Sequence, residues 1–272
     1  MFLNFSLNQW VRWFWGVQSN FRRLIRGEEA FIIITPPFLR RQIILSRVNK
    51  LRIHSLVARD NIDIRTLYDI FLEQPYSQKK FIRSDLIRNK WVIFDFGANV
   101  GYSSLFFMLT IPNSTVIALE PDVKNFQLAK WNTRDCKSRI YILHGAIGPR
   151  PGVVNITNES AESDAYRVSI SDSENGVRMY SPNELAKLHK FDDARKMYKI
   201  DIEGFEKELF SENTEWFSES DVVIIEPHDW MLPKSSGLSG FLKLAASNER
   251  DFLISGENVC SVRCSSRDGL RK

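Results

Sequence analysis

The sequence predicts an α/β fold built on a largely parallel sheet with helices on both faces. From residue 91 onward, short apolar runs of strand length alternate with amphipathic stretches of helical length. The run 92–96 leads into a turn with glycines at Gly97 and Gly101, which is typical of the first strand–turn–helix unit of such a sheet. The 272 residues, of which 43% are hydrophobic, are enough for one domain of this kind with an added terminal segment.

The expected elements follow one another regularly along the chain. Strands are predicted at 91–96, 115–120, 139–143, 196–202 and 221–226, and helices at 102–110, 121–135, 204–210 and 238–246. A closing hairpin is expected to turn at Gly256-Glu257, and a helical lead-in to lie within residues 60–90. The polar segment 155–176 interrupts the alternation, and we expect it either to cover a substrate or to form a solvated loop.

Residues 1–58 differ from the rest and are predicted to form an N-terminal amphipathic, helical extension. The folded domain is then expected to span residues 59–272, with its core at about 92–232. Between residues 10 and 26, apolar side chains recur at helical spacing opposite a face of arginines. Such a helix either lies on an anionic membrane surface or packs on this protein or a second subunit.

Composition excludes several classes of partner and location. The net charge of +4 is spread along the chain without a nucleic-acid-binding signature, so no nucleic-acid partner is expected. No apolar run approaches the roughly 18 residues of a membrane span, and the N-terminus lacks the pattern of a signal peptide. We therefore expect a cytoplasmic protein, with peripheral contact at the inner membrane face as the alternative.

Polar side chains stand at or near the carboxyl ends of five predicted strands, where ligands bind in open α/β sheets. They are Asp95, Glu120, His144, Asp201 and Glu226. Glu120 comes 19 residues after Gly101, at the end of the second strand. A carboxylate at that place accepts hydrogen bonds from both ribose hydroxyls of a nucleoside.

The glycine turn itself departs from the dinucleotide pattern G-x-G-x-x-G. Asn99 replaces the middle glycine, Tyr102 replaces the third, and the acid Asp95 ends the strand. A carboxylate suits a ligand with hydroxyls and a positive centre better than a pyrophosphate, which favours S-adenosylmethionine as the cofactor. The predicted cofactor-binding residues are Asp95, Gly97, Ala98, Asn99, Gly101, Tyr102, Glu120, Pro121, His144, Gly145, Ala146, Asp201 and Glu203.

Four runs carry a resemblance to a known family. They are 92–104, 116–122, Lys199-Ile-Asp-Ile-Glu-Gly-Phe-Glu206 and Ile224-Ile-Glu-Pro-His-Asp-Trp230. Together they resemble the FkbM family of S-adenosylmethionine-dependent O-methyltransferases, over about residues 60–262. The resemblance implies the class I methyltransferase (Rossmann-like) fold, with a seven-stranded, mostly parallel sheet whose last strand is antiparallel. It also implies a methyl acceptor with a hydroxyl group, on a sugar, a lipid or a polyketide-type product, and a lipid-linked saccharide would suit an amphipathic N-terminus.

Methyl transfer to an alcohol requires that its proton be removed by a base or acidified by a metal. The predicted catalytic residues are His228, Asp201 and Glu226. In the favoured hypothesis His228 or Asp201 is the general base, and no metal is included. In one alternative a divalent ion is held by ligands drawn from Asp201, Glu203, Glu226 and His228. In the other, Asp201 and Glu203 are structural.

Two rival functions remain open at the level of sequence. One is a nicotinamide-dependent oxidoreductase or epimerase, against which the missing middle glycine and Asp95 count. The other is a non-catalytic adaptor that keeps the fold and uses its N-terminal helix to bind a membrane or a partner.

Overall fold

The computed structural model describes the backbone of residues 31–34, 42–47, 50–76, 88–157, 167–171, 176–188, 193–229 and 236–264, with side chains from residue 56 onward. The amphipathic pattern predicted between residues 10 and 26 lies outside the described residues. Within the described part of the chain, no helix is both long and apolar enough to cross a membrane.

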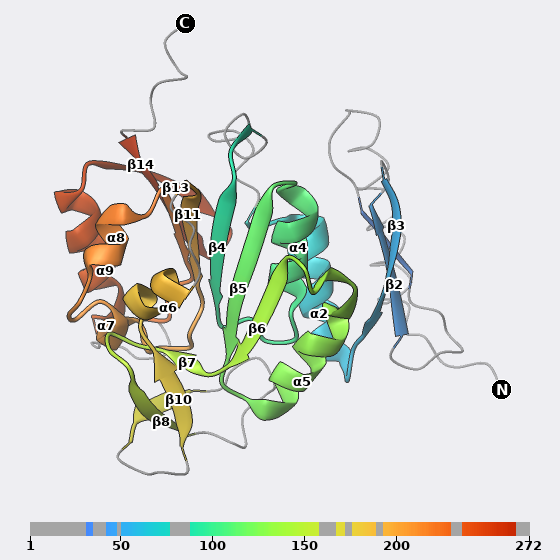
Figure 1. Ribbon diagram of the computed structural model, residues 1–272, viewed down its shortest axis with the longest axis horizontal. Coiled ribbons are helices and arrows are strands. Elements are labelled where there is room, and N and C mark those ends of the chain that lie inside the picture. Colours follow the sequence, from blue (N-terminus) through green and yellow to red (C-terminus); the bar gives the residue numbers. More distant parts are fainter. Residues whose placement is uncertain are drawn as a thin grey trace, which may run out of the picture.

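A seven-stranded sheet forms the centre of the domain (Figure 1). Its strands are, in order across the sheet, β13 (Arg250–Ser255), β14 (Asn258–Arg263), β12 (Val222–Ile225), β11 (Arg195–Ile200), β4 (Trp91–Phe96), β5 (Ser114–Glu120) and β6 (Ile140–His144). The neighbours from β12 to β6 pair in parallel, whereas β14 runs antiparallel to both β12 and β13. This arrangement confirms the predicted fold class, because seven strands with an antiparallel last strand are what the resemblance implies.

Helices cover both faces of this sheet (Figure 1). On one face lie α2 (Asn61–Tyr68), the π-helical turn η1 (Asp69–Glu73), α4 (Tyr102–Thr110) and α5 (Val123–Asn132). On the other face lie α6 (Pro182–Leu188), α7 (Glu206–Leu209), α8 (Glu215–Glu219) and α9 (Gly237–Ser247). A short 3-10 turn, η2 (Arg134–Cys136), follows α5. The sequence predicted the longer helices to within a few residues but missed α6 and α8.

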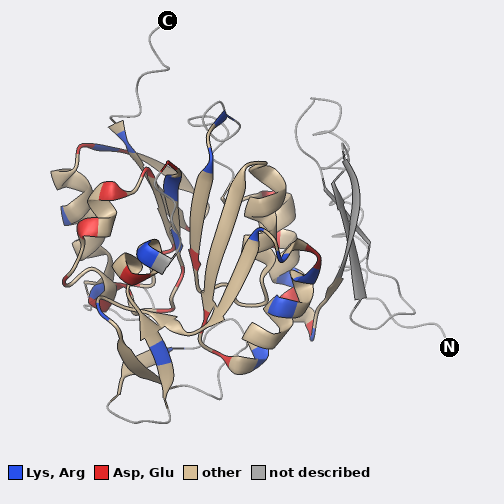
Figure 2. Cartoon of the chain, in the orientation of Figure 1, with Lys and Arg blue, Asp and Glu red and all other residues tan. Residues whose placement is uncertain are grey.

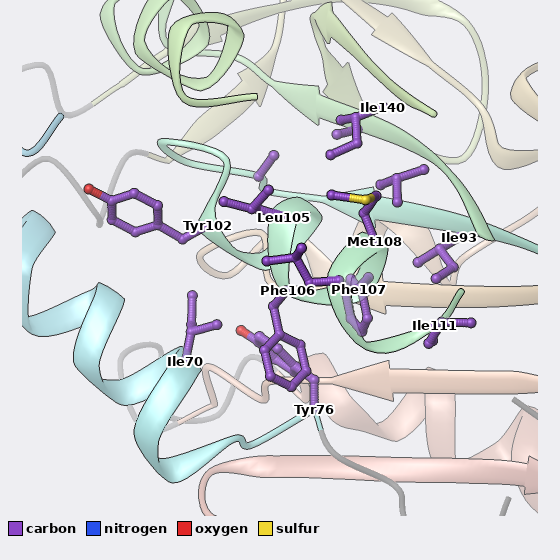
Figure 3. Packing of buried hydrophobic residues seen from close by; sticks show 14 of the residues in the cluster. Ile70, Tyr76, Ile93, Tyr102, Leu105, Phe106, Phe107, Met108, Ile111 and Ile140 are labelled. Carbon is purple, nitrogen blue, oxygen red and sulfur yellow. The ribbon is translucent and has the colours of Figure 1, made fainter. Parts of the chain in front are cut away.

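The helical lead-in is part of the domain rather than an appendage. Helix α4 is buried on all sides, because η1 and the residues after it cover the flank that does not face the sheet. Phe71 and Tyr76 of this cover pack on Phe106, with ring centroids 5.6 and 6.3 Å apart, and Tyr76 also packs on Phe107 (Figure 3). This packing holds Tyr76 and η1 in place on that face of the sheet.

The second face of the sheet has an aromatic core of its own. Phe94 of β4 and Tyr198 of β11 stack with their rings 4.6 Å apart and nearly parallel, and Trp216 of α8 packs on Tyr198. All three side chains are fully buried. Burial of side chains this large contributes on the order of 1.5–3 kcal/mol each, which fixes the spacing of the two central strands.

The helical character predicted for residues 1–58 is wrong where this segment is described, over residues 31–34, 42–47 and 50–57. There β1 (Phe31–Ile34), β2 (Gln42–Arg47) and β3 (Lys50–Val57) form an antiparallel sheet in the order β1-β2-β3. The physical reason is the isoleucine-rich runs of β1 and β2, since β-branched side chains favour extended backbone. The end of β3 is attached to α5, where the amide of Val57 donates to Asn132 Oδ1 at 2.8 Å.

Short strands lie within and on either side of the interrupting segment 155–176. A second sheet, ordered β7-β10-β8-β9, consists of β7 (Ala146–Ile147), β8 (Gly152–Ile156), β9 (Val168–Ile170) and β10 (Val177–Tyr180). It lies beyond the carboxyl ends of β4, β5 and β6 (Figure 1). These strands were not predicted because each has only two to five residues, too few for a clear alternation of apolar and polar side chains.

Gly97 permits the closest approach between two strand ends. Its φ is +76°, and a Cβ added to it would lie 1.8 Å from the carbonyl oxygen of Asp201. A side chain there would be strained and would also force β4 and β11 apart. The glycine is therefore required by the contact between the strands, whatever ligand binds nearby.

We predict that Gly97→Ala lowers the free energy of unfolding by about 2–4 kcal/mol, because both the backbone strain and the clash with Asp201 must be relieved. Urea denaturation measures this change. The matched control is Gly256→Ala, whose φ is +59° but whose Cβ would meet nothing within 4 Å. Equal losses in the two variants would contradict the role assigned to the close contact.

Candidate functional site

A cavity of about 610 Å³ opens at the carboxyl ends of the central strands. Figure 2 shows acidic residues in red at these ends of β4 and β5. The lead-in closes the cavity from one side and the β13–β14 turn from another. Of the predicted site residues, those that line it are Gly97, Ala98, Asn99, Tyr102, Glu120, Pro121, Gly145, Ala146, Asp201, Glu203 and Glu226. Asp95, Gly101, His144 and His228 are not in its lining.

Glu120 is placed as the sequence predicted, in the wall of the cavity beside the glycine turn. Its Oε2 accepts the amide of Asn99 at 2.8 Å, and its Oε1 accepts the amide of Asp122 at 2.9 Å. Burial raises the pKa of the carboxyl to about 7, although these two amides act in the opposite direction. The carboxylate has lone pairs left for further donors, such as a pair of hydroxyls.

Asp95 lies behind the cavity wall, so this geometry gives it no direct contact with a ligand. It is fully buried, and its Oδ2 accepts hydrogen bonds from the hydroxyls of Ser103 and Ser104 in the first turn of α4, at 2.7 and 2.6 Å. Its Oδ1 lies 3.5 Å from Nζ of Lys199. The acid at the end of β4 therefore joins the strand to the helix that follows it and to β11.

Lys199 lies in this wall of the cavity and is 2% exposed. Its ammonium lies 3.1 Å from Asp201 Oδ2 and donates to the carbonyl oxygen of Gly97 at 2.7 Å. Burial pushes the pKa of Lys199 down, but the charges of Asp201 and Asp95 outweigh it, so the net pKa is raised. Lys199 is thus a permanent cation among the strand ends.

Three other predicted residues have structural partners. Gly101 begins α4 with a φ of +86°, and a Cβ there would lie 3.2 Å from the Cα of Ala129. Tyr102 lines the cavity, but its hydroxyl donates to the carbonyl of Val57 at 3.0 Å. His144 packs its ring on Phe126, and its Nε2 lies 3.0 Å from the carbonyl oxygen of Pro121. These contacts shape the wall without assigning a ligand to it.

Glu226 is the predicted catalytic residue with the most suitable environment for proton transfer. It lines the cavity directly after β12, next to Asp201 at the end of β11. The negative charge of Asp201, together with burial, raises the pKa of Glu226 to about 7. Its carboxyl can therefore take up or release a proton near neutral pH.

His228 has a different environment from the one a neutral-pH base requires. It is 4% exposed, and its Nδ1 lies 2.8 Å from Glu206 Oε1. Burial alone would lower the pKa of His228, but the negative charges of Glu206, Asp201 and Glu203 outweigh this effect and raise the pKa to about 9. The imidazole is consequently protonated at neutral pH, so the geometry does not support His228 as the base. The protonated ring instead lies beside the carboxylates of Asp201 and Glu203, at 3.7 and 3.6 Å.

Asp201, Glu203 and His228 also offer three ligand atoms within 4.8 Å of one another. One imidazole and two carboxylates are suitable ligands for a divalent ion. The metal hypothesis therefore has three candidate ligands, and Glu226 is not one of them. The ammonium of Lys199 beside Asp201 opposes a second cation at this place. The site that we favour therefore contains no metal ion.

Several residues that line the cavity were not predicted. They are Lys199 in β11, Tyr76 and acidic residues of the lead-in, and Glu257 and Asn258 of the closing hairpin. Lys199 carries a signal that sequence reasoning could have used, because a lysine in a central strand is buried only when it has a partner. The others come from segments without a chemical motif. Val168 of β9 lines the cavity too, so part of the interrupting segment does contribute to the site.

No family model and no curated protein sequence matches the chain. Among solved structures, similarity is found to methyltransferase FkbM from Methylobacillus flagellatus, with 16% identity and a TM-score of 0.45 over 76% of this chain and 56% of that one. An O-methyltransferase from Bacillus cereus in complex with SAH has 14% identity and a TM-score of 0.43, over 76% and 93%. A methyltransferase from Geobacter sulfurreducens has 14% identity and a TM-score of 0.41, over 76% and 91%. The chain thus resembles methyltransferases, one of them of the FkbM type, at the level of the fold, and it spans little more than half of the first.

We predict that His228 makes the stability of the protein depend on pH. Because its folded-state pKa of about 9 exceeds the ordinary value of 6.5, its contribution is complete below pH 6.5 and is lost as the pH rises through 9. The free energy of unfolding should fall between pH 7 and 10 by on the order of 1–3 kcal/mol more in the wild type than in His228→Gln. Denaturant titrations at each pH measure this, and an equal fall in the wild type and in His228→Gln would contradict the ionic role assigned to His228.

Proposed function

We propose that this protein is an S-adenosylmethionine-dependent methyltransferase that transfers the methyl group to a hydroxyl. The observation that carries the proposal is the position of Glu120, a buried carboxylate in the wall of a cavity formed by the strand ends of this fold. A carboxylate there recognises a nucleoside by its ribose hydroxyls. The acceptor in this proposal is a saccharide, a lipid-type molecule or a secondary metabolite, and contact of the N-terminal segment with a membrane stays a prediction.

The residues present fit this cofactor. Glu120 would accept the ribose hydroxyls, and Pro121, Gly145 and Ala146 would border the base. The turn 97–99 and the first residues of α4 would face the amino-acid part, whose carboxylate is favoured by a helix N-terminus. Asp201 and Glu203 supply negative charge for its ammonium and sulfonium groups. When bound, S-adenosylmethionine supplies an electrophilic methyl group on its sulfonium.

Glu226 is the general base in this proposal. Its carboxylate would take the proton of the acceptor hydroxyl as the oxygen forms its bond to the methyl carbon and the carbon–sulfur bond breaks. A pKa of about 7 leaves a large fraction of Glu226 ionised at neutral pH and makes it basic enough to accept the proton. Lys199 and His228 act as positioning residues, because they hold Asp201 and Glu203 in place from behind.

The first test concerns Glu120. We predict that Glu120→Gln weakens the binding of S-adenosylhomocysteine by on the order of 1–3 kcal/mol, because a charge-assisted acceptor becomes a neutral one. Isothermal calorimetry measures the affinity, and Glu219→Gln, on the exposed surface, is the matched control. An unchanged affinity, or binding of NAD in place of S-adenosylhomocysteine, would contradict the role of Glu120 in binding the cofactor.

The same binding should depend on pH in the wild type. Since the unliganded carboxyl of Glu120 has a pKa of about 7 and the ribose hydroxyls donate to its ionised form, the affinity should rise by about tenfold between pH 6 and 8. Glu120→Gln should flatten this profile. A profile that is equally steep in the variant would assign the dependence to another group.

The second test concerns turnover. We predict that Glu226→Gln lowers kcat by about 10²–10⁴-fold while the affinity for S-adenosylhomocysteine is kept, because only proton removal is lost. Formation of S-adenosylhomocysteine in the presence of a panel of sugars, glycolipids and polyketide alcohols identifies an acceptor, on which the variants are then compared. His228→Gln should retain far more activity than Glu226→Gln, and the reverse order would restore His228 as the base.

A further inference from the structure

We propose that the methyl acceptor is a polyol that carries an ammonium group near the hydroxyl that is methylated. This inference rests on the proposed function and adds the chemical class of the acceptor. It comes from the charge of the cavity lining and from one buried carboxamide. The carboxamide and the rim charges belong to the lead-in and the β13–β14 hairpin, whereas Glu120 ends β5.

The described lining of the cavity is strongly acidic. It contains the basic residues Arg65 and Lys199, against the acidic residues Asp69, Glu73, Glu120, Asp201, Glu203, Glu226 and Glu257. The charge of Lys199 is already used, because it forms ion pairs with Asp95 and Asp201. S-adenosylmethionine has a net charge of +1, so a negative excess remains when it is bound, even though Glu120 and Glu226, with pKa values of about 7, are partly protonated at neutral pH. An acceptor with a phosphate or carboxylate would be repelled by this lining.

The acidic excess continues to the rim on the acceptor side. Glu73, at the end of η1, and Glu257, in the β13–β14 turn, are both exposed and both line the cavity. They belong to segments more than 180 residues apart in the sequence, so the charge is not a property of one polar loop. Rim charges of this kind attract a cation from solution and fix its orientation on entry.

Asn258 provides an independent indication of a donor-rich ligand. This residue lines the cavity and is 4% exposed, yet its Oδ1 accepts no hydrogen bond from any described residue. The register of β14 on β12, in which Val259 faces Ile225, places Asn258 next to Glu226. A buried acceptor without a donor destabilises the folded protein, and a ligand that donates to it would remove this cost.

An ammonium group matches these features in one respect that a hydroxyl does not. It offers three donors and no acceptor, whereas a hydroxyl brings acceptor lone pairs that this lining of carboxylate and carboxamide oxygens does not need. While protonated and held by carboxylates, the nitrogen has no lone pair for attack on a methyl group. The neighbouring hydroxyl, deprotonated by Glu226, remains the nucleophile.

The experiment uses three probes of one shape and different charge. The full-length protein is saturated with S-adenosylhomocysteine and titrated with glucosamine, glucose or glucose 6-phosphate, with binding followed by ligand-observed NMR. We expect glucosamine to bind about tenfold more tightly than glucose, and glucose 6-phosphate to bind more weakly than glucose. The preference for glucosamine should shrink in 0.5 M salt, since the rim charges are screened.

Variants locate the effect. Glu73→Gln and Glu257→Gln should each reduce glucosamine affinity by about threefold and leave glucose unchanged, as expected for exposed charge pairs. Glu212→Gln, an exposed glutamate outside the lining, is the matched control and should change neither. Equal binding of glucose and glucosamine, preferred binding of the phosphate, or no binding of any probe overturns the acceptor class while the cofactor site stands. Failure of S-adenosylhomocysteine itself to bind overturns the proposed function and this inference with it.

Discussion

The ammonium of Lys199 is the group on which the arrangement of the strand ends depends. It contacts the carboxylates of Asp95 and Asp201 and the carbonyl of Gly97, so a single buried cation links β4 to β11. Asp95 extends the link to α4 through Ser103 and Ser104. Removing one partner of such a buried network costs on the order of 3–5 kcal/mol, because an uncompensated charge is left behind. The close contact between Gly97 and the carbonyl of Asp201 requires that residue 97 have no side chain, and the Lys199 network holds the two strand ends together at this point.

The positions of the strand-end acids could be predicted from the sequence, but their long-range partners could not. The strands and the acids at their ends follow from apolar runs and from the rule that ligands bind at strand ends, and Glu120 lies in the cavity as expected. Asp95 ends its strand as predicted, but its side chain points to a partner 104 residues later in the chain, which no local pattern reveals. The strands over residues 31–57 were missed because the helical pattern before residue 26 was extended over isoleucine-rich segments.

The same ionic interactions decide which group can act as a base. The sequence favours His228 or Asp201 as the base, and histidine is the obvious candidate because it titrates near neutral pH in water. In the structure Glu206, Asp201 and Glu203 surround it and raise its pKa to about 9, while Asp201 raises the pKa of Glu226 to about 7. The carboxylates of one cluster thus shift a histidine away from neutrality and a glutamate toward it. In the proposed mechanism it is therefore the environment of each group, rather than its residue type, that separates the positioning groups from the proton acceptor.

The two buried cations of the site, Lys199 and His228, are paired with carboxylates of the protein itself, and this determines which ligand charges the cavity favours. Lys199 and His228 are both at least 96% buried and both paired with carboxylates, so neither offers its charge to a molecule that enters the cavity. Most of the charged groups that line the cavity are carboxylates, and they come from the central strand ends, the lead-in and the closing hairpin. In the proposed function, the sulfonium beside Asp201 and the acceptor ammonium beside Glu226 and Glu257 would both be attracted by this negative excess. The fold stabilises its strand ends with buried positive charge, and the ligands must supply the rest.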